Sequence, residues 1–146
     1  MEKVFNLLNE QLFGVLSGEE YLVISFTGEN SQFIRFNNAL VRQTGLVDDA
    51  NVGLKFIANG RTCHGAFTIS GNQNIDFQRG LAEINRMRKE SEELPEDPYL
   101  VLPKNLGSSN EIKKSNGINF DDSVDALTPV MEGIDLVGIW VNGKMF

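Results

Sequence analysis

The sequence contains little of what metal or thiol chemistry requires. Its 146 residues include one cysteine and one histidine. A single cysteine excludes an internal disulfide, and a single histidine leaves little for a transition-metal site. The longest apolar runs reach about six residues, against the roughly 20 that a membrane-spanning helix needs. The N-terminus has no basic-then-apolar signal pattern. These absences predict a cytoplasmic protein that makes no membrane contact.

Positive charge is also scarce. Thirteen lysines and arginines stand against 20 aspartates and glutamates, which gives a formal net charge of −7. Because an acidic protein repels phosphate backbones, we expect no nucleic-acid partner. Hydrophobic residues make up 41% of the chain, and a chain of this length can bury a sizeable core without covalent cross-links. The composition predicts a globular protein with no metal or thiol chemistry of its own.

Two segments have the apolar spacing of amphipathic helices. The first, residues 2–16, ends near Ser17-Gly18. In the second, Asn74 is the expected N-cap and Asp76 complements the helix dipole. Helical spacing then continues through Phe77, Leu81, Ile84, Met87 and Ser91. This second helix, over residues 75–93, must end by Leu94, because Pro95 disfavours helical geometry in the residue before it.

The segments between these helices are typical of short strands. Residues 21–26 form an apolar strand, and residues 27–30 form a turn cluster. Two further strands, at 32–36 and 39–47, flank Asn37-Asn38, which favours a type I′ turn. That turn would pair Phe36 with Ala39. We therefore expect three short strands in this part of the chain, each ended by a turn.

Asn59-Gly60 is the strongest hairpin signal in the sequence. A two-residue turn there sets the register of strands 52–58 and 61–69. The expected core face pairs Phe56 with Cys63, Leu54 with Gly65, and Val52 with Phe67. The expected outer face pairs Lys55 with His64, Gly53 with Ala66, and Ile57 with Thr62. The strip at Gly53 and Ala66 could admit a partner backbone, although a local twist or bulge is the favoured interpretation.

Cys63 and His64 are the only nucleophile and base pair that the composition offers. Neighbouring side chains of a strand point to opposite faces, so this thiol and imidazole cannot share a proton. We interpret Cys63 as a small buried residue and His64 as a surface residue beside Lys55. The glycines beside antiparallel strands offer no phosphate cradle. No catalytic, cofactor-binding or metal-ligating residue is predicted in this chain.

Three charged clusters complete the set of candidate sites. They are Glu90, Glu92, Glu93, Glu96 and Asp97; Asp121, Asp122 and Asp125; and Arg86, Arg88 and Lys89. The first could bind a hard cation, but it lacks the glycine-centred spacing of a calcium loop. We interpret the first as a solvated helix end, the second as cap and first-turn residues, and the third as solvated helix surface.

The C-terminal third changes character. Residues 95–120 are rich in proline and loop-forming residues, and we predict a surface connector whose apolar island, 99–102, docks on the main body. Asp121 or Asp122 should cap a short helix that Pro129 limits. A strand at 135–141 then leads to Asn142-Gly143, which favours a second hairpin turn. Because only three residues follow, we expect a chain cut from a longer protein just as a new strand begins.

The order of these motifs resembles the N-terminal region of the TldD/PmbA family, also called the modulator of DNA gyrase family. The resemblance covers nearly the whole chain, but only the first part of a family member. The residues that carry it are Gly53, Gly60-Arg61, Gly65-Ala66, the helix 81–89, Asp97-Pro98, Leu102-Pro103 and the run 133–138.

This resemblance implies a domain of a zinc-dependent peptidase or peptide-maturation protein. Family members are predicted metallopeptidases that often act as homodimers or as paired heterodimers of two paralogues. Their zinc motif, H-E-x-x-x-H, lies in the C-terminal half, so any zinc would sit beyond this chain. The chain itself would support dimerisation or form part of a peptide-binding cavity. The alternative is a free-standing α+β interaction module with no enzymatic role.

The expected fold class is α+β, with an antiparallel sheet of hairpins packed against two amphipathic helices in two layers. The expected organisation is an α+β domain at 1–94 and a connector at 95–120. A short helix and strand at 121–146 would then lead into a missing C-terminal region.

Overall fold

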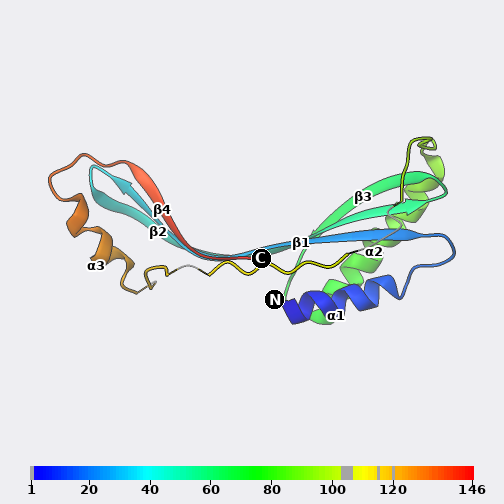
Figure 1. Ribbon diagram of the computed structural model, residues 1–146, viewed down its shortest axis with the longest axis horizontal. Helices are drawn as coiled ribbons and strands as arrows, with labels where there is room; N and C mark the ends of the chain where they lie inside the picture. The colour runs from blue at the N-terminus through cyan, green and yellow to red at the C-terminus, as the bar shows by residue number, and fades with distance from the viewer. Residues whose placement is uncertain (1, 103–106, 115, 120) are drawn as a thin grey trace. The chain divides into compact units, whose positions relative to one another are not determined.

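The computed structural model describes residues 2–102, 107–114, 116–119 and 121–146. Its elements, in chain order, are α1 (Glu2–Phe13), β1 (Tyr21–Asn37), β2 (Leu40–Ala58), β3 (Arg61–Thr68), α2 (Gln73–Glu93), α3 (Ser123–Leu127), the 3₁₀ turn η1 (Pro129–Met131) and β4 (Gly138–Met145). The strands form one sheet in the order β3-β2-β1-β4 (Figure 1). The predicted α+β class and antiparallel sheet are confirmed.

The first two strands are much longer than predicted. β1 has 17 residues and β2 has 19, whereas typical strands have about 3–10. The predicted turn at residues 27–30 is wrong, because Glu29 pairs with Met145 and Asn30 with Lys144. Likewise, no break separates residues 47 and 52 in β2. Hydrogen bonds from a neighbouring strand therefore overrule the local turn preference of Gly28-Glu29-Asn30.

The contacts divide the chain into two compact units. Unit 1 contains residues 1–28 and 50–106, and unit 2 contains residues 29–49 and 107–146. Both β1 and β2 run through the two units, so each unit is built from segments that lie far apart in the sequence. The predicted boundaries at residues 94 and 120 stay a prediction, but the strand segment at 29–49 groups with the C-terminal third.

In unit 1, the sheet packs against the two long helices. The predicted register of the β2–β3 hairpin is confirmed, with Phe56 opposite Cys63 and Val52 opposite Phe67. Asn59 and Gly60 have positive φ, as a type I′ turn requires. Val52, Leu54, Phe56 and Cys63 join Leu8, Leu12, Ile84 and Met87 in one core. Ile57, predicted on the outer face, is nevertheless buried.

The helices of unit 1 differ from the prediction at their ends. α1 ends at Phe13 rather than near residue 16. The N-cap of α2 is Asn72, not Asn74, because the Asn72 side chain accepts hydrogen bonds from the amides of Asn74 and Ile75. The C-cap, Leu94, confirms the predicted stop before Pro95. Gly80 lets the helices approach closely, since a Cβ there would lie 2.7 Å from Leu12 Cδ2.

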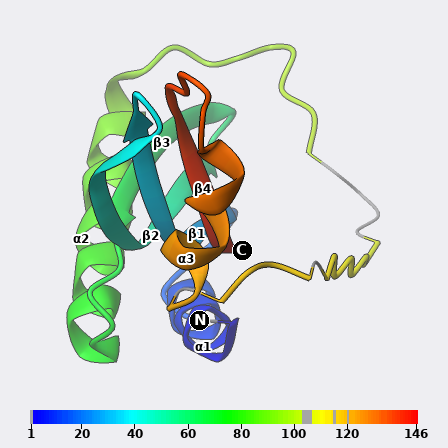
Figure 2. The same cartoon turned by 90° about the vertical axis from the view of Figure 1, so that its left-hand side faces the viewer.

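In unit 2, α3 and η1 cover one face of β1 and β4. Ile34, Phe36 and Met131 form the core, with Val124, Leu127, Leu136 and Trp140 packed around it; Figure 2 shows α3 in orange beside β4. Asp122 is the N-cap of α3, as predicted, but its side chain makes no capping bond. Pro129 begins the 3₁₀ turn, which fits its predicted role of limiting the helix.

The turn between β1 and β2 lies one residue beyond its predicted place. Asn38 and Ala39 both have positive φ, so Ala39 is a turn residue and does not pair with Phe36. The Ala39 amide donates to the carbonyl of Leu136 at 3.1 Å, and its side chain packs against the unit 2 core. This tertiary contact favours Ala39 in a conformation that its type seldom adopts.

The predicted hairpin turn at Asn142-Gly143 is wrong. β4 continues through both residues, which pair with Gln32 and Ser31 of β1. A Cβ at position 143 would collide with the Asn30 carbonyl and with Ser31. This glycine therefore permits close backbone approach rather than a turn, and the turn that motivated the expectation of a cut chain is absent.

The described start of the connector lies against the hairpin end of unit 1. The Asp97 amide donates to the carbonyl of Gly60 at 2.8 Å. The apolar island docks only in part, since Tyr99 and Val101 are 87% and 84% exposed while Leu100 and Leu102 are half-buried. Some of the connector lies outside the described residues, namely Pro103 of the Leu102-Pro103 motif and positions 104–106, 115 and 120.

Candidate functional site

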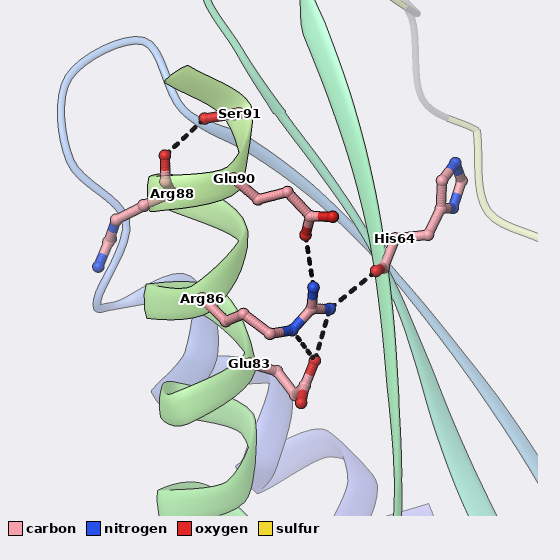
Figure 3. Close-up of polar contacts among 6 residues, drawn as sticks. All are labelled: His64, Glu83, Arg86, Arg88, Glu90 and Ser91. Carbon is pink, nitrogen blue, oxygen red and sulfur yellow. Dashed lines mark hydrogen bonds and ion pairs between the residues drawn. The ribbon is translucent and has the colours of Figure 1, made fainter. Parts of the chain in front are cut away.

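Cys63 and His64 occupy opposite faces of β3, as predicted. Cys63 is buried, and burial, followed by the negative charge of Glu90, raises the pKa of its thiol. The His64 ring is exposed and points away from α2 (Figure 3). The only atom that His64 contributes to the polar contacts drawn there is its backbone carbonyl oxygen. The pair therefore has no geometry for proton transfer.

Arg86 is the centre of a charged network on α2 (Figure 3). Its guanidinium donates to Glu83 at 2.9 Å and to Glu90, and it reaches the His64 carbonyl of β3 at 3.0 Å. The hydrogen bonds and charges of Glu83 and Glu90, led by the hydrogen bond to Glu83, raise the pKa of Arg86. Arg86 was predicted to lie on the solvated surface of the helix. Its guanidinium group instead connects α2 to β3, an end strand of the sheet.

A second arginine of α2 contacts the same edge strand. Arg79 donates to the carbonyl of Thr68 at 2.8 Å, as Arg86 does to the carbonyl of His64. The two arginines are seven residues apart, or about two helical turns. β3 is an end strand of the sheet, so its outward carbonyls would otherwise be open to another strand. The two guanidinium groups therefore protect this edge.

Arg88 joins α2 to the segment that follows α1. It donates to both oxygens of Glu20, at 2.7 and 2.8 Å, and to the carbonyl of Val15 at 2.6 Å. The Glu20 side chain is 13% exposed. The hydrogen bonds from Arg88 hold the pKa of Glu20 below its ordinary value, against the opposing effect of burial. Arg88 is thus a structural clamp, and its predicted role as solvated helix surface is wrong.

The acidic residues in the last turn of α2 and just after it do not form a ligand cluster. Glu90 pairs with Arg86, and Glu96 pairs with Arg61 at 3.0 Å. The side chain of Asp97 accepts from the amide of Tyr99 at 2.9 Å. Among the residues that the structure describes, no three His, Cys, Asp or Glu side chains lie close enough together to hold a metal ion.

The glycine strip on the outer hairpin face is occupied by the chain itself. The Ser25 hydroxyl of β1 donates to the Gly53 carbonyl at 3.3 Å. It also lies 2.6 Å from the place that a Cβ of Gly53 would take. A partner backbone at this strip would have to displace Ser25, so the geometry does not favour the docking interpretation.

One hollow opens on the outward face of α2. It is lined by Ala82, Asn85, Arg86, Lys89, Glu90 and Glu93. The hollow is open to solvent, its charges are mixed, and its arginine and one glutamate are already paired with each other.

In the part of the chain that the structure describes, no helix is long and apolar enough to cross a membrane.

Comparison with solved structures finds the same fold in several chains, among them one from Thermotoga maritima and one from Thermococcus kodakarensis. The first is the crystal structure of a candidate modulator of DNA gyrase from Thermotoga maritima, with a TM-score of 0.59 and 13% identity. The second is TldE from Thermococcus kodakarensis, with a TM-score of 0.62 and 12% identity. The chain has the fold of these two proteins.

The match extends over nearly all of this chain but over a minor part of the others. It covers 97% and 99% of this chain, and 38% and 37% of the Thermotoga and Thermococcus chains. No protein-family profile and no curated protein sequence matches. The resemblance predicted from the motif order is therefore confirmed at the level of the fold, and the partial coverage fits a domain of a longer protein.

Sequence reasoning missed the polar residues that hold unit 1 together. Asp76 is completely buried and accepts from the Ser70 amide and hydroxyl, both at 2.7 Å, and from the Gly71 amide. It therefore anchors the end of β3 to the start of α2, beyond its predicted dipole role. Nothing in the local sequence indicates the Arg88–Glu20 pair, since all of β1, β2 and β3 and most of α2 lie between its members.

Proposed function

We propose that this chain is the N-terminal, non-catalytic domain of a TldD/PmbA-like protein, whose full-length form is a zinc-dependent peptidase or peptide-maturation protein. The domain supports dimerisation, with itself or with a paralogue, or forms one wall of a peptide cavity. The observation that carries the proposal is a fold shared over 97–99% of this chain and over only 37–38% of the two solved structures.

The donor set of this chain does not fit a zinc site. Its only histidine and its only cysteine lie on opposite faces of β3, and zinc sites use several such ligands on one side. Among the described residues, the carboxylates are not grouped closely enough to hold a metal ion. The proposal therefore assigns peptide hydrolysis, and any zinc, to the region that follows this domain in the longer protein.

The test is the reading frame beyond Phe146. We expect it to continue for more than the length of this domain and to encode H-E-x-x-x-H, and the full-length product to bind zinc and to cleave peptides in a chelator-sensitive way. A stop codon directly after residue 146 would overturn the proposal in favour of a free-standing interaction module. A long reading frame without the motif would retain the domain assignment and reject the peptidase role, leaving a non-catalytic partner subunit.

A further inference from the structure

One stretch of β1 has a neighbouring strand on one side only. β1 lies between β2 and β4, but its pairing with β4 covers only Glu29 to Phe36. Beside residues 21–28, the described part of the chain provides no strand on the β4 side. In an antiparallel strand, successive residues direct their backbone groups to opposite neighbours. About half of the amides and carbonyls of residues 21–28 therefore point toward an open edge.

The sequence of this edge is typical of a central strand. Tyr21–Phe26 is apolar at every position except Ser25, and residues 21–28 contain no charge and no proline. Exposed sheet edges usually carry charges, prolines, bulges or a covering group. The end strand β3 is protected in this way, because Arg79 and Arg86 donate to its carbonyls. Among the described residues, no side chain protects the β1 edge like this, so the edge is suited to a further strand.

The core side of β1 is covered less completely than that of β2. Ile24 and Phe26 pack against the unit 1 core, but they are only half-buried. Val52, Leu54 and Phe56, which β2 contributes to the same core, are at most 3% exposed. Burial therefore falls off from β2 to β1. Apolar side chains from one more strand beside β1 would remove the remaining exposed area of this core from water.

β4 approaches this edge in a defined register. It pairs with β1 antiparallel, and its last pair joins Met145 to Glu29. In an antiparallel pair, each further residue of one strand lies opposite the preceding residue of the other. Phe146 would then fall opposite Gly28, and positions 147–153 of a longer chain would fall opposite Thr27 back to Tyr21.

We propose that positions 147–153 of the longer protein extend β4 along residues 21–27, so that β1 becomes a central strand over its whole length. This inference rests on the proposed function, because it takes its strand from the region that follows this domain. The match covers only 37–38% of the two solved chains, which leaves ample length for such a strand. The continuous register favours this segment over a strand from another molecule, since a continuing strand loses neither loop-closure nor association entropy.

The reading frame beyond Phe146 provides the first test. We expect apolar residues at positions 148, 150 and 152, which in this register would lie opposite Phe26, Ile24 and Leu22 on the core side. We expect no proline from 147 to 153, because a proline cannot donate to a neighbouring strand. A proline or a glycine-rich loop at these positions would overturn this inference alone. A stop codon after residue 146 would overturn both this inference and the proposed function.

Hydrogen exchange followed by mass spectrometry tests the pairing itself. In the peptide that covers residues 21–28, the outward amides should exchange at least about a hundredfold more slowly in the full-length product than in the 146-residue chain. The peptide 52–58 of β2 is the matched control, because it has a strand on each side. It should be protected in both chains.

Two outcomes of this experiment would contradict the strand extension. Protection of residues 21–28 already present in the 146-residue chain would overturn it, because another segment or a second copy would then cover the edge. Rapid exchange of residues 21–28 in both chains would overturn it as well. Zinc binding and peptide cleavage by the full-length product would in that case still support the proposed function, so the two failures are distinguishable.

Discussion

The Arg88–Glu20 clamp offers the sharpest stability prediction. Arg88→Ala removes the two hydrogen bonds to Glu20 and the one to the Val15 carbonyl. It leaves a carboxylate that is only 13% exposed, with the amide and side chain of Ser17 as its remaining donors among the described residues. Hydrogen bonds to charged groups contribute about 1.5–3 kcal/mol each when buried, and exposed ion pairs contribute about 0–1 kcal/mol. For this half-buried pair, we expect a loss of about 2 kcal/mol.

The same clamp makes stability depend on pH in a defined direction. Because the folded-state pKa of Glu20 lies below its ordinary value of 4.5, the clamp stabilises fully above that value. Its contribution is lost as the pH falls below 4.5 through the folded-state pKa. Arg88→Ala should therefore unfold at a lower urea concentration than the parent at pH 7, and the difference should shrink in acid.

Urea unfolding followed by far-ultraviolet circular dichroism measures both effects, because α1 and α2 supply most of the helical signal of the chain. Lys89→Ala is the matched control, since it removes an exposed cation from the next position of the same helix. A loss below about 0.5 kcal/mol for Arg88→Ala at neutral pH, within the range of ordinary surface substitutions, would refute the clamp. So would a loss that does not decrease in acid.

Three further predictions concern single positions. Asp76→Ala should cost about 2–4 kcal/mol, because it leaves the Ser70 and Gly71 donors without their buried acceptor; thermal unfolding measures this, with Asp125→Ala as the exposed control. Gly80→Leu should cost at least about 1–3 kcal/mol through overpacking against Leu12 and Phe67, and an unchanged melting temperature would contradict the close approach of α1 and α2. Alkylation of Cys63 at pH 8 should be at least about tenfold slower in the folded chain than in urea, since burial both covers the thiol and raises its pKa; equal rates would show that Cys63 is outside the core.

The sequence predicted structure well where one local signal decided the geometry. Asn59-Gly60 set the register of the β2–β3 hairpin correctly at every predicted pair, because its two residues adopt the positive φ that a two-residue turn needs. The same dipeptide at Asn142-Gly143 misled the prediction. There, the absence of a Cβ lets β4 lie against Ser31, a requirement that comes from a strand more than a hundred residues earlier.

For the candidate site, the sequence predicted only that Cys63 and His64 do not form a catalytic pair. Adjacent positions in one strand were enough to separate the Cys63 thiol from the His64 imidazole. The roles of Arg79, Arg86 and Arg88 were not predictable, because each guanidinium reaches a group on another element. The helical pattern of the sequence places these arginines where solvent-exposed residues of α2 are expected. Only the packing of α2 against β3 and α1 distinguishes them.

The pairing of the last strand with the first has a consequence for synthesis on the ribosome. Unit 1 uses only residues that precede residue 107, so its core can close while residues 107–146 are still being made. The middle of the first hairpin must wait, because Ile34 and Phe36 are covered by Met131 and Trp140. During that interval the apolar side chains of Ile34 and Phe36 stay exposed on the emerging chain. Slow translation or truncation within residues 107–146 should therefore yield a protein whose unit 1 is folded. The exposed apolar residues of its sheet would favour aggregation.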